Sequence, residues 1–134
     1  LEYGHVKLRE QLGLLSGPVE EFQKSATAEH NAMLNMLVEE GYLDKAALDD
    51  EAANENEIVD ALYRGLKGSP CKLMAASIVD AVGEKRTQNQ PGTSSEYSNW
   101  RVPLAGPDLK VVHTDEVFDL PRVQSLAAIM NGEK

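Results

Sequence analysis

The sequence predicts a mainly α-helical chain, placed in the α+β class because one segment near residues 72–82 has the composition of a short strand. Apolar residues recur at helical spacing in several separate segments. The length of 134 residues fits one compact domain rather than two. Hydrophobic residues make up 42% of the chain and charged residues 26%, which is ordinary globular composition. We therefore expect one modest core of packed helices.

The first half of the chain is predicted to form a series of helices. Leucines spaced by four and then three residues predict a first helix over residues 5–15: Leu8, Leu12 and Leu15. A longer helix is predicted over residues 18–40, since a proline begins it, two glutamates follow, and Gly41 offers a stop. The acidic stretch 44–57 predicts a short solvated helix and then a loop. A third helix is predicted over residues 56–66.

The strand of the α+β prediction lies in a short apolar run. Residues 71–82 are nearly all small or apolar, and Pro70 and Gly83 bound them. Such a run is either a buried helical segment or a strand covered on both faces, and periodicity alone does not decide. Its one cysteine, Cys71, has no partner for a disulfide or a zinc site, so we expect a buried, inert thiol in the reducing cytoplasm.

The rest of the chain is predicted to be irregular until a final helix. Glycine and proline clusters break residues 84–118, which we interpret as a loop. The last helix is predicted over residues 119–131, with Asp119 as its cap, Pro121 in its first turn and Gly132 as its stop.

Charge excludes two classes of partner. The chain has 13 basic and 22 acidic residues, and therefore a net charge of −9. That balance argues against binding of nucleic acid or of an anionic membrane surface, both of which require a surplus of lysine and arginine. No apolar run of about 18 residues is present, so the sequence predicts no transmembrane helix.

Few side chains suggest catalysis or metal binding. Most of the acidic residues fall on polar helix faces, and Asp80 is the exception because it closes the apolar run, where it either serves an active site or caps the turn before Gly83. The three histidines lie far apart, without metal-ligand spacing: His5, His30 and His113. We expect His30 to be a satisfied core histidine. Three aromatic residues are either a sugar-stacking platform or packing anchors: Tyr63, Tyr97 and Trp100.

One motif in the predicted loop is specific. Residues 89–104 contain Asn-Gln-Pro-Gly-Thr and then Glu-Tyr-Ser-Asn-Trp-Arg. This stretch resembles the C-terminal region of bacterial amylomaltases, the 4-alpha-glucanotransferases of glycoside hydrolase family 77. Ser98 stands where that family often has proline, which loosens the turn without removing a functional group. Residues 69–83 resemble the family's last barrel strand with the turn after it, and residues 121–130 fit its closing helix.

The resemblance implies a place in a larger fold. The chain would correspond to the last βα portion of a TIM (β/α)8 barrel, and residues 1–134 to a single C-terminal fragment of a larger catalytic domain. The start at Leu1, without an initiator methionine, fits the same expectation of a longer protein. The implied parts are helices, last strand, loop and closing helix: 1–68, 69–83, 84–118 and 119–131.

The resemblance also implies a function. The full-length enzyme would transfer alpha-1,4-glucan segments between maltodextrins by a retaining double displacement, with no metal or organic cofactor. The family's catalytic carboxylates lie on earlier strands and have no counterpart here, so the chain is expected to be inactive alone. Asn89 and Asn99 are candidate substrate-binding residues, since an amide both donates to and accepts from sugar hydroxyls, and Trp100 is a third. Turn chemistry is the competing role for both asparagines.

Two expectations concern the isolated chain. The alternative to a glucanotransferase segment is a free-standing helical domain that binds a protein or a glucan without catalysis. A barrel strand without its neighbours would leave backbone groups unpaired. We therefore expect residues 72–82 either to pair with another copy of the chain, giving self-association, or to fold as a helix.

Overall fold

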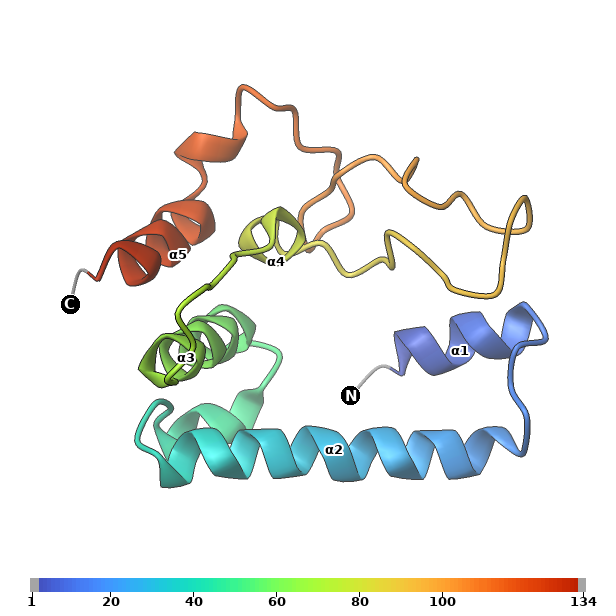
Figure 1. Ribbon diagram of the computed structural model, residues 1–134, viewed down its shortest axis with the longest axis horizontal. Helices are drawn as coiled ribbons and strands as arrows, with labels where there is room; N and C mark the ends of the chain where they lie inside the picture. The colour runs from blue at the N-terminus through green and yellow to red at the C-terminus, as the bar shows by residue number, and fades with distance from the viewer. Residues whose placement is uncertain (1–2, 133–134) are drawn as a thin grey trace.

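The computed structural model describes residues 3–132 and is mostly helical, as predicted (Figure 1). Five α-helices are present within that range: α1 (Gly4–Gln11), α2 (Val19–Glu39), α3 (Glu55–Gly68), α4 (Ile78–Val82) and α5 (Pro121–Asn131). Two short 3-10 helices accompany them: η1 (Lys45–Asp50) and η2 (Val117–Asp119). Residues 3–132 contain no β-strand, and their isolated bridge joins Ala105 to Val111.

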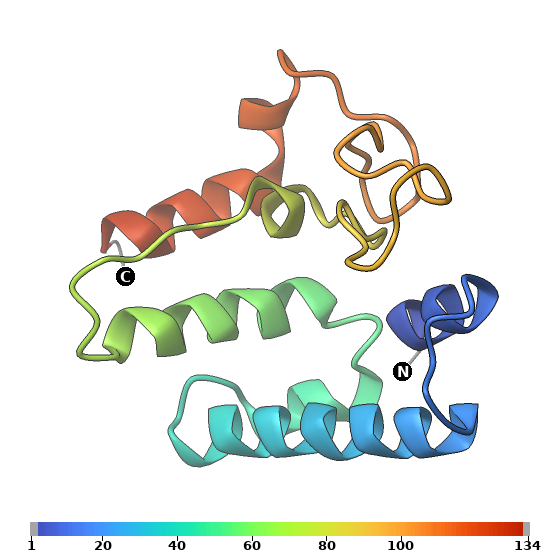
Figure 2. The same cartoon turned by 45° about the vertical axis from the view of Figure 1, so that its right-hand side comes forward.

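The helices form layers with α3 in the middle, between α2 with η1 and α5 (Figure 2). One face of α3 contributes to a first apolar cluster with α2, η1 and the turn between them: Leu34, Leu37, Leu43, Ala47, Ile58 and Ala61. Its other face contributes to a second cluster with α4 and α5: Tyr63, Ala81, Leu126 and Ile129. Since α3 is apolar on two sides, it joins both clusters.

Polar contacts fasten α5 to α3 at two points. Lys67 Nζ donates to the carbonyls of Ile129 at 2.6 Å and Met130 at 3.2 Å, near the C-terminal end of α5. A lysine there satisfies carbonyls that have no partner inside the helix. Ser125 Oγ donates to the buried Asp60 Oδ2 at 2.5 Å. The α3–α5 contact is therefore fixed by hydrogen bonds at two separate points.

The predicted C-terminal end is confirmed for α2, whereas that of the first helix is corrected. Gly41, with φ +75°, follows the C-cap Glu40 and stops α2 as expected. The first helix stops at Gln11 rather than residue 15, because Gly13 is left-handed and Leu14 N–H donates back to Arg9 O at 2.8 Å.

The closing helix begins two residues later than predicted. Asp119 is not its cap, since α5 begins at Pro121 and Asp119 lies in η2. Leu120 precedes the proline and takes the extended backbone that this position favours, with ψ 127°. The end of the helix at Gly132, which has φ +86°, is as predicted.

The strand near residues 72–82 is a wrong prediction for this chain. Residues 78–82 form α4 instead, and residues 72–77 are irregular. A parallel strand requires a neighbour for its backbone groups, and residues 3–132 provide none. Helical bonds satisfy part of the segment locally, among them Ala81 N–H to Ser77 O at 3.0 Å. The helical alternative therefore holds over residues 78–82.

Cys71 also departs from its prediction, because its side chain is exposed rather than buried. It lies in the connection between α3 and α4, which contributes to neither apolar cluster. The composition of the run 71–82 suggested burial, but the part before α4 passes outside the core. The exposed Leu73, at 93%, belongs to the same connection.

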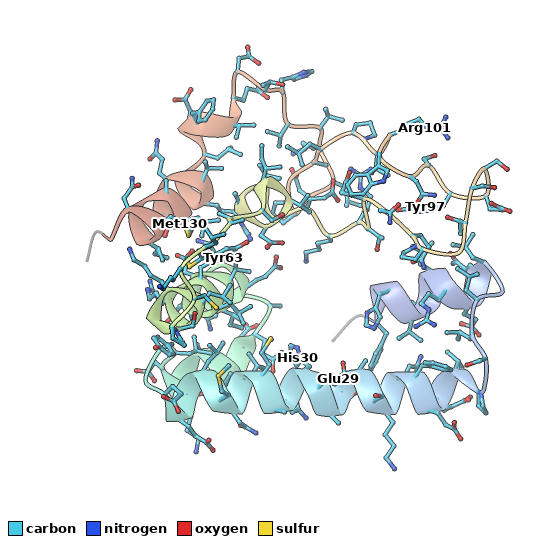
Figure 3. All side chains as sticks on the ribbon, viewed as in Figure 1. Glu29, His30, Tyr63, Tyr97, Arg101 and Met130 are labelled. Atoms are coloured by element: carbon cyan, nitrogen blue, oxygen red, sulfur yellow. The ribbon has the colours of Figure 1, made fainter. Side chains whose placement is uncertain are left out.

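The start of α4 is fixed by one buried tyrosine on α3, labelled in Figure 3. Tyr63 hydroxyl donates to Asp80 Oδ2 at 2.7 Å and accepts from Ser77 N–H at 3.0 Å. Burial, and next the hydrogen bond to Asp80, raise the pKa of Tyr63. Asp80 is therefore a partner of Tyr63 within α4 and not a residue at the end of a strand.

Replacing Tyr63 with phenylalanine is expected to lower the free energy of unfolding by about 1–2 kcal/mol, since two hydrogen bonds are lost and Ser77 N–H keeps no protein partner. Urea unfolding followed by circular dichroism measures the change. Tyr42→Phe is the matched control, because the Tyr42 hydroxyl makes no hydrogen bond within residues 3–132. Equal stability of the two variants would contradict the assigned role.

Candidate functional site

The three candidate substrate-binding residues lie in one irregular segment, residues 84–105, which we call the site loop. It follows α4 and extends beside α1, as the labelled Tyr97 and Arg101 indicate (Figure 3). The loop folds back on itself, so that its first residues approach its last. Contacts at three levels, the base, the middle and the tip, hold the two halves together.

At the base, a buried carboxylate joins the ends of the loop. The Glu84 side chain is 0% exposed and accepts hydrogen bonds from Arg86 Nη2 at 2.6 Å, Nε at 2.9 Å and backbone N–H at 2.8 Å. Ala105 N–H, from the far end of the loop, donates to it at 2.9 Å. Arg86 Nη2 also donates to Pro103 O at 2.6 Å. The hydrogen bonds from Arg86 lower the pKa of Glu84 despite its burial.

In the middle, two contacts cross between the halves. Tyr97 hydroxyl donates to the carbonyl of Thr87, and Trp100 N–H donates to Gln88 O at 2.8 Å. Trp100 has φ +59°, a left-handed conformation that is uncommon for a bulky side chain. The hydrogen bond to Gln88 holds the backbone of Trp100 in this left-handed conformation.

At the tip, the Pro-Gly-Thr motif makes a turn that Asn99 closes. Gly92 has φ +86°, as the third position of a type II turn requires. Thr93 Oγ1 donates to Gln90 O at 2.7 Å and accepts from Asn99 Nδ2 at 2.8 Å. Asn99 Oδ1 accepts from Gln90 N–H at 2.7 Å. Hydrogen bonds of Asn99 therefore join the Asn-Gln-Pro-Gly-Thr motif to the Glu-Tyr-Ser-Asn-Trp-Arg motif.

The structure gives the three candidates different surroundings. Trp100 is 77% exposed, so its ring is available for stacking. Asn89 is half-buried, and its side chain makes no hydrogen bond within residues 3–132. Asn99 uses one donor and one acceptor position inside the loop, and retains one of each. Asn99 thus combines a structural contact with free hydrogen-bonding capacity.

Sequence reasoning missed the residues that shape the loop: Glu84, Arg86 and Thr87. An acidic and a basic residue two positions apart are a common surface pattern, and nothing in the pattern indicates burial. It also missed Gln88, whose buried Nε2 has no hydrogen-bond partner among the described residues. This amide precedes Asn89 and adds a second unused donor in the same part of the loop.

The other candidates have local partners. His30 Nε2 lies 2.7 Å from Glu51 Oε2, so the histidine has a partner as predicted, but it is half-buried and belongs to neither apolar cluster, so it is not a core residue. Residues 3–132 contain no cluster of three or more potential metal ligands. No helix in the described part of the chain has the length and hydropathy needed to span a membrane.

The helical scaffold and the braced Pro-Gly-Thr loop are matched by one class of enzyme. The sequence model of glycoside hydrolase family 77, described as 4-alpha-glucanotransferase, matches residues 15–109. Because this is well over half of the chain, the chain belongs to that family.

Individual relatives agree with the family. The chain is 47% identical over 122 residues to 4-alpha-glucanotransferases of Mycobacterium bovis and Mycobacterium tuberculosis. This alignment covers 91% of the chain but 16% of each relative, so the chain spans a small part of their length. The crystal structure of amylomaltase from Corynebacterium glutamicum matches 93% of the chain and 18% of that protein, with a TM-score of 0.83 and 26% identity.

Glu84 predicts a pH dependence of stability. Its pKa in the folded chain lies below the ordinary value of 4.5, so the carboxylate stabilises the fold above about pH 4.5 and loses this effect as the pH falls through the folded pKa. Glu84→Gln should therefore be less stable at pH 7 by roughly 1–3 kcal/mol, and the difference should shrink below pH 4.5. Urea unfolding of both proteins between pH 7 and pH 3 measures it. A constant difference across that range would contradict the assignment.

Proposed function

We propose that the chain is the C-terminal part of a 4-alpha-glucanotransferase that transfers alpha-1,4-glucan segments between maltodextrins. Family membership supports this class of reaction, and the site loop is the observation that carries the proposal. The loop presents the exposed Trp100 together with the half-buried amides of Asn89 and Asn99, which retain free donors and acceptors, and this is the combination that sugar rings and hydroxyls require.

In this proposal the chain supplies contacts to the glucan, while the catalytic groups come from the rest of the enzyme. A retaining double displacement requires two carboxyl groups about 5 Å apart on opposite sides of the scissile bond. Among residues 3–132 the buried carboxylates are Asp60 and Glu84, and both already accept hydrogen bonds, from Ser125 and from Arg86 respectively. Neither forms a pair suited to acid–base chemistry, which supports inactivity of the isolated chain.

The proposal assigns the loop residues distinct roles. Trp100 stacks on the apolar face of a sugar ring, and Asn89 hydrogen-bonds sugar hydroxyls. Asn99 closes the turn at the tip and offers its remaining N–H to the same ligand. No metal and no organic cofactor takes part.

The proposal also places the chain in a barrel. Residues 1–134 are a single C-terminal segment of a catalytic domain built on a (β/α)8 barrel. The segment 72–76 supports this, because its backbone groups make no hydrogen bond to other described residues. They are therefore free to pair with strands of the longer protein.

Incubation of the chain with maltotriose tests the division of roles. We expect neither glucose nor longer maltodextrins from the chain alone, and both from the longer enzyme under the same conditions, because the buried carboxylates among residues 3–132 are engaged by Ser125 and Arg86. Chromatography of the products measures this. Products from the isolated chain would show that it contains a catalytic pair, and an inactive longer enzyme would contradict the proposed reaction.

The isolated chain is also proposed to self-associate through the uncovered segment before α4. Leu73 is 93% exposed and Ile78 is 55% exposed, so apolar surface remains that a second copy can cover. Size-exclusion chromatography with light scattering should show a dimer or larger species, and Leu73→Ser should shift it toward the monomer. Leu66→Ser, at a 52% exposed leucine on α3, is the control. A monomer at all concentrations would contradict self-association.

A further inference from the structure

Glu84 connects the helical scaffold to the site loop. Its backbone N–H donates to Val79 O at 3.0 Å, so the residue is fixed to the C-terminal end of α4. Gly83 before it has φ +78°, and a Cβ at Gly83 would lie 2.7 Å from Arg122 Cζ on α5. The backbone at Glu84 is therefore fixed to α4 at a point close to Arg122 of α5, while its side chain reaches the far end of the loop.

The carboxylate holds both ends of the loop in one place. Its oxygens bind Arg86 on the outgoing half and Ala105 on the returning half, and Ala105 is 0% exposed. Arg86 extends the contact to Pro103. A buried charge without these donors would be costly, so the carboxylate favours the one loop arrangement that supplies all of them.

We propose that Glu84 is a positioning residue for glucan binding, which fixes the site loop so that Asn89 and Trp100 face one ligand. This inference rests on the proposed function of the loop. Glu84 itself makes no contact with the glucan, and acts through the pairing of the two loop halves. Preorganisation of this kind strengthens binding because the ligand does not have to order the loop.

The arrangement predicts how a small change spreads through the loop. Glu84→Gln keeps the shape of the side chain but removes its charge, and turns an N–H group toward the donors of Arg86. The base of the loop then opens more often, and the contacts further out lose their alignment. The affected amides are those of Gln90, which donates to Asn99, and Trp100, which donates to Gln88.

Amide hydrogen exchange measured by NMR tests the positioning role. We expect Glu84→Gln to speed exchange at Gln90 and Trp100 by about tenfold, with exchange at Leu37 in the first apolar cluster unchanged. Arg86→Lys, which keeps the charge but loses the planar fork, should give a smaller increase. Glu57→Gln on the exposed face of α3 is the matched control and should change none of these rates. Unchanged rates at Gln90 and Trp100 in Glu84→Gln would overturn the proposal.

Titration with maltoheptaose separates positioning from general stability. Trp100 is the single tryptophan, so its fluorescence reports binding at the site loop. We expect Glu84→Gln, under conditions where it is fully folded, to raise the Kd by about five- to tenfold, and Glu57→Gln to leave it unchanged. An unchanged Kd in Glu84→Gln would overturn the positioning role. If the unaltered chain did not bind maltoheptaose, the proposed glucan-binding function of the loop would be contradicted. The exchange rates would still decide whether Glu84 orders the loop.

Discussion

The burial of one carboxylate governs the shape of the site. The side chain of Glu84 is buried, and a charge in that position persists only when hydrogen-bond donors replace the water. Those donors come from Arg86 and Ala105, which lie on opposite halves of the loop. A long irregular segment without regular secondary structure is thereby given one conformation. Side chains here perform the role that backbone pairing performs in a β-hairpin.

The scaffold beneath the loop depends on a helix that is apolar on two faces. Because α3 packs against α2 on one side and α5 on the other, the two apolar clusters form one continuous support. Tyr63 extends this support to α4 through Asp80, and α4 leads directly into Glu84. Hydrogen bonds that begin at the buried Tyr63 and continue through α4 to Glu84 therefore fix the position of the loop.

The sequence predicted the helices well and the long-range contacts poorly. Periodicity located α2 and α3, and glycines located the ends of α2 and α5, because these features are local. The strand over residues 72–82 failed since pairing depends on chain segments elsewhere, which composition does not describe. Exposure of Cys71 and burial of Glu84 were missed for the same reason: both follow from tertiary packing. The motif at Asn99 was found, but its hydrogen bonds to Gln90 and Thr93 were not.

The described residues leave apolar surface of the kind that a segment of a larger protein would have. Among the described residues, the buried carboxylates of Asp60 and Glu84 accept structural hydrogen bonds. The apolar side chains of Leu73, Ile78 and Phe118 are exposed. Exposed surface of this kind is typical of a face that packs against further protein. A free-standing binding domain would gain nothing from it, because uncovered apolar surface favours aggregation. The uncovered apolar side chains therefore argue for further protein that packs against this face.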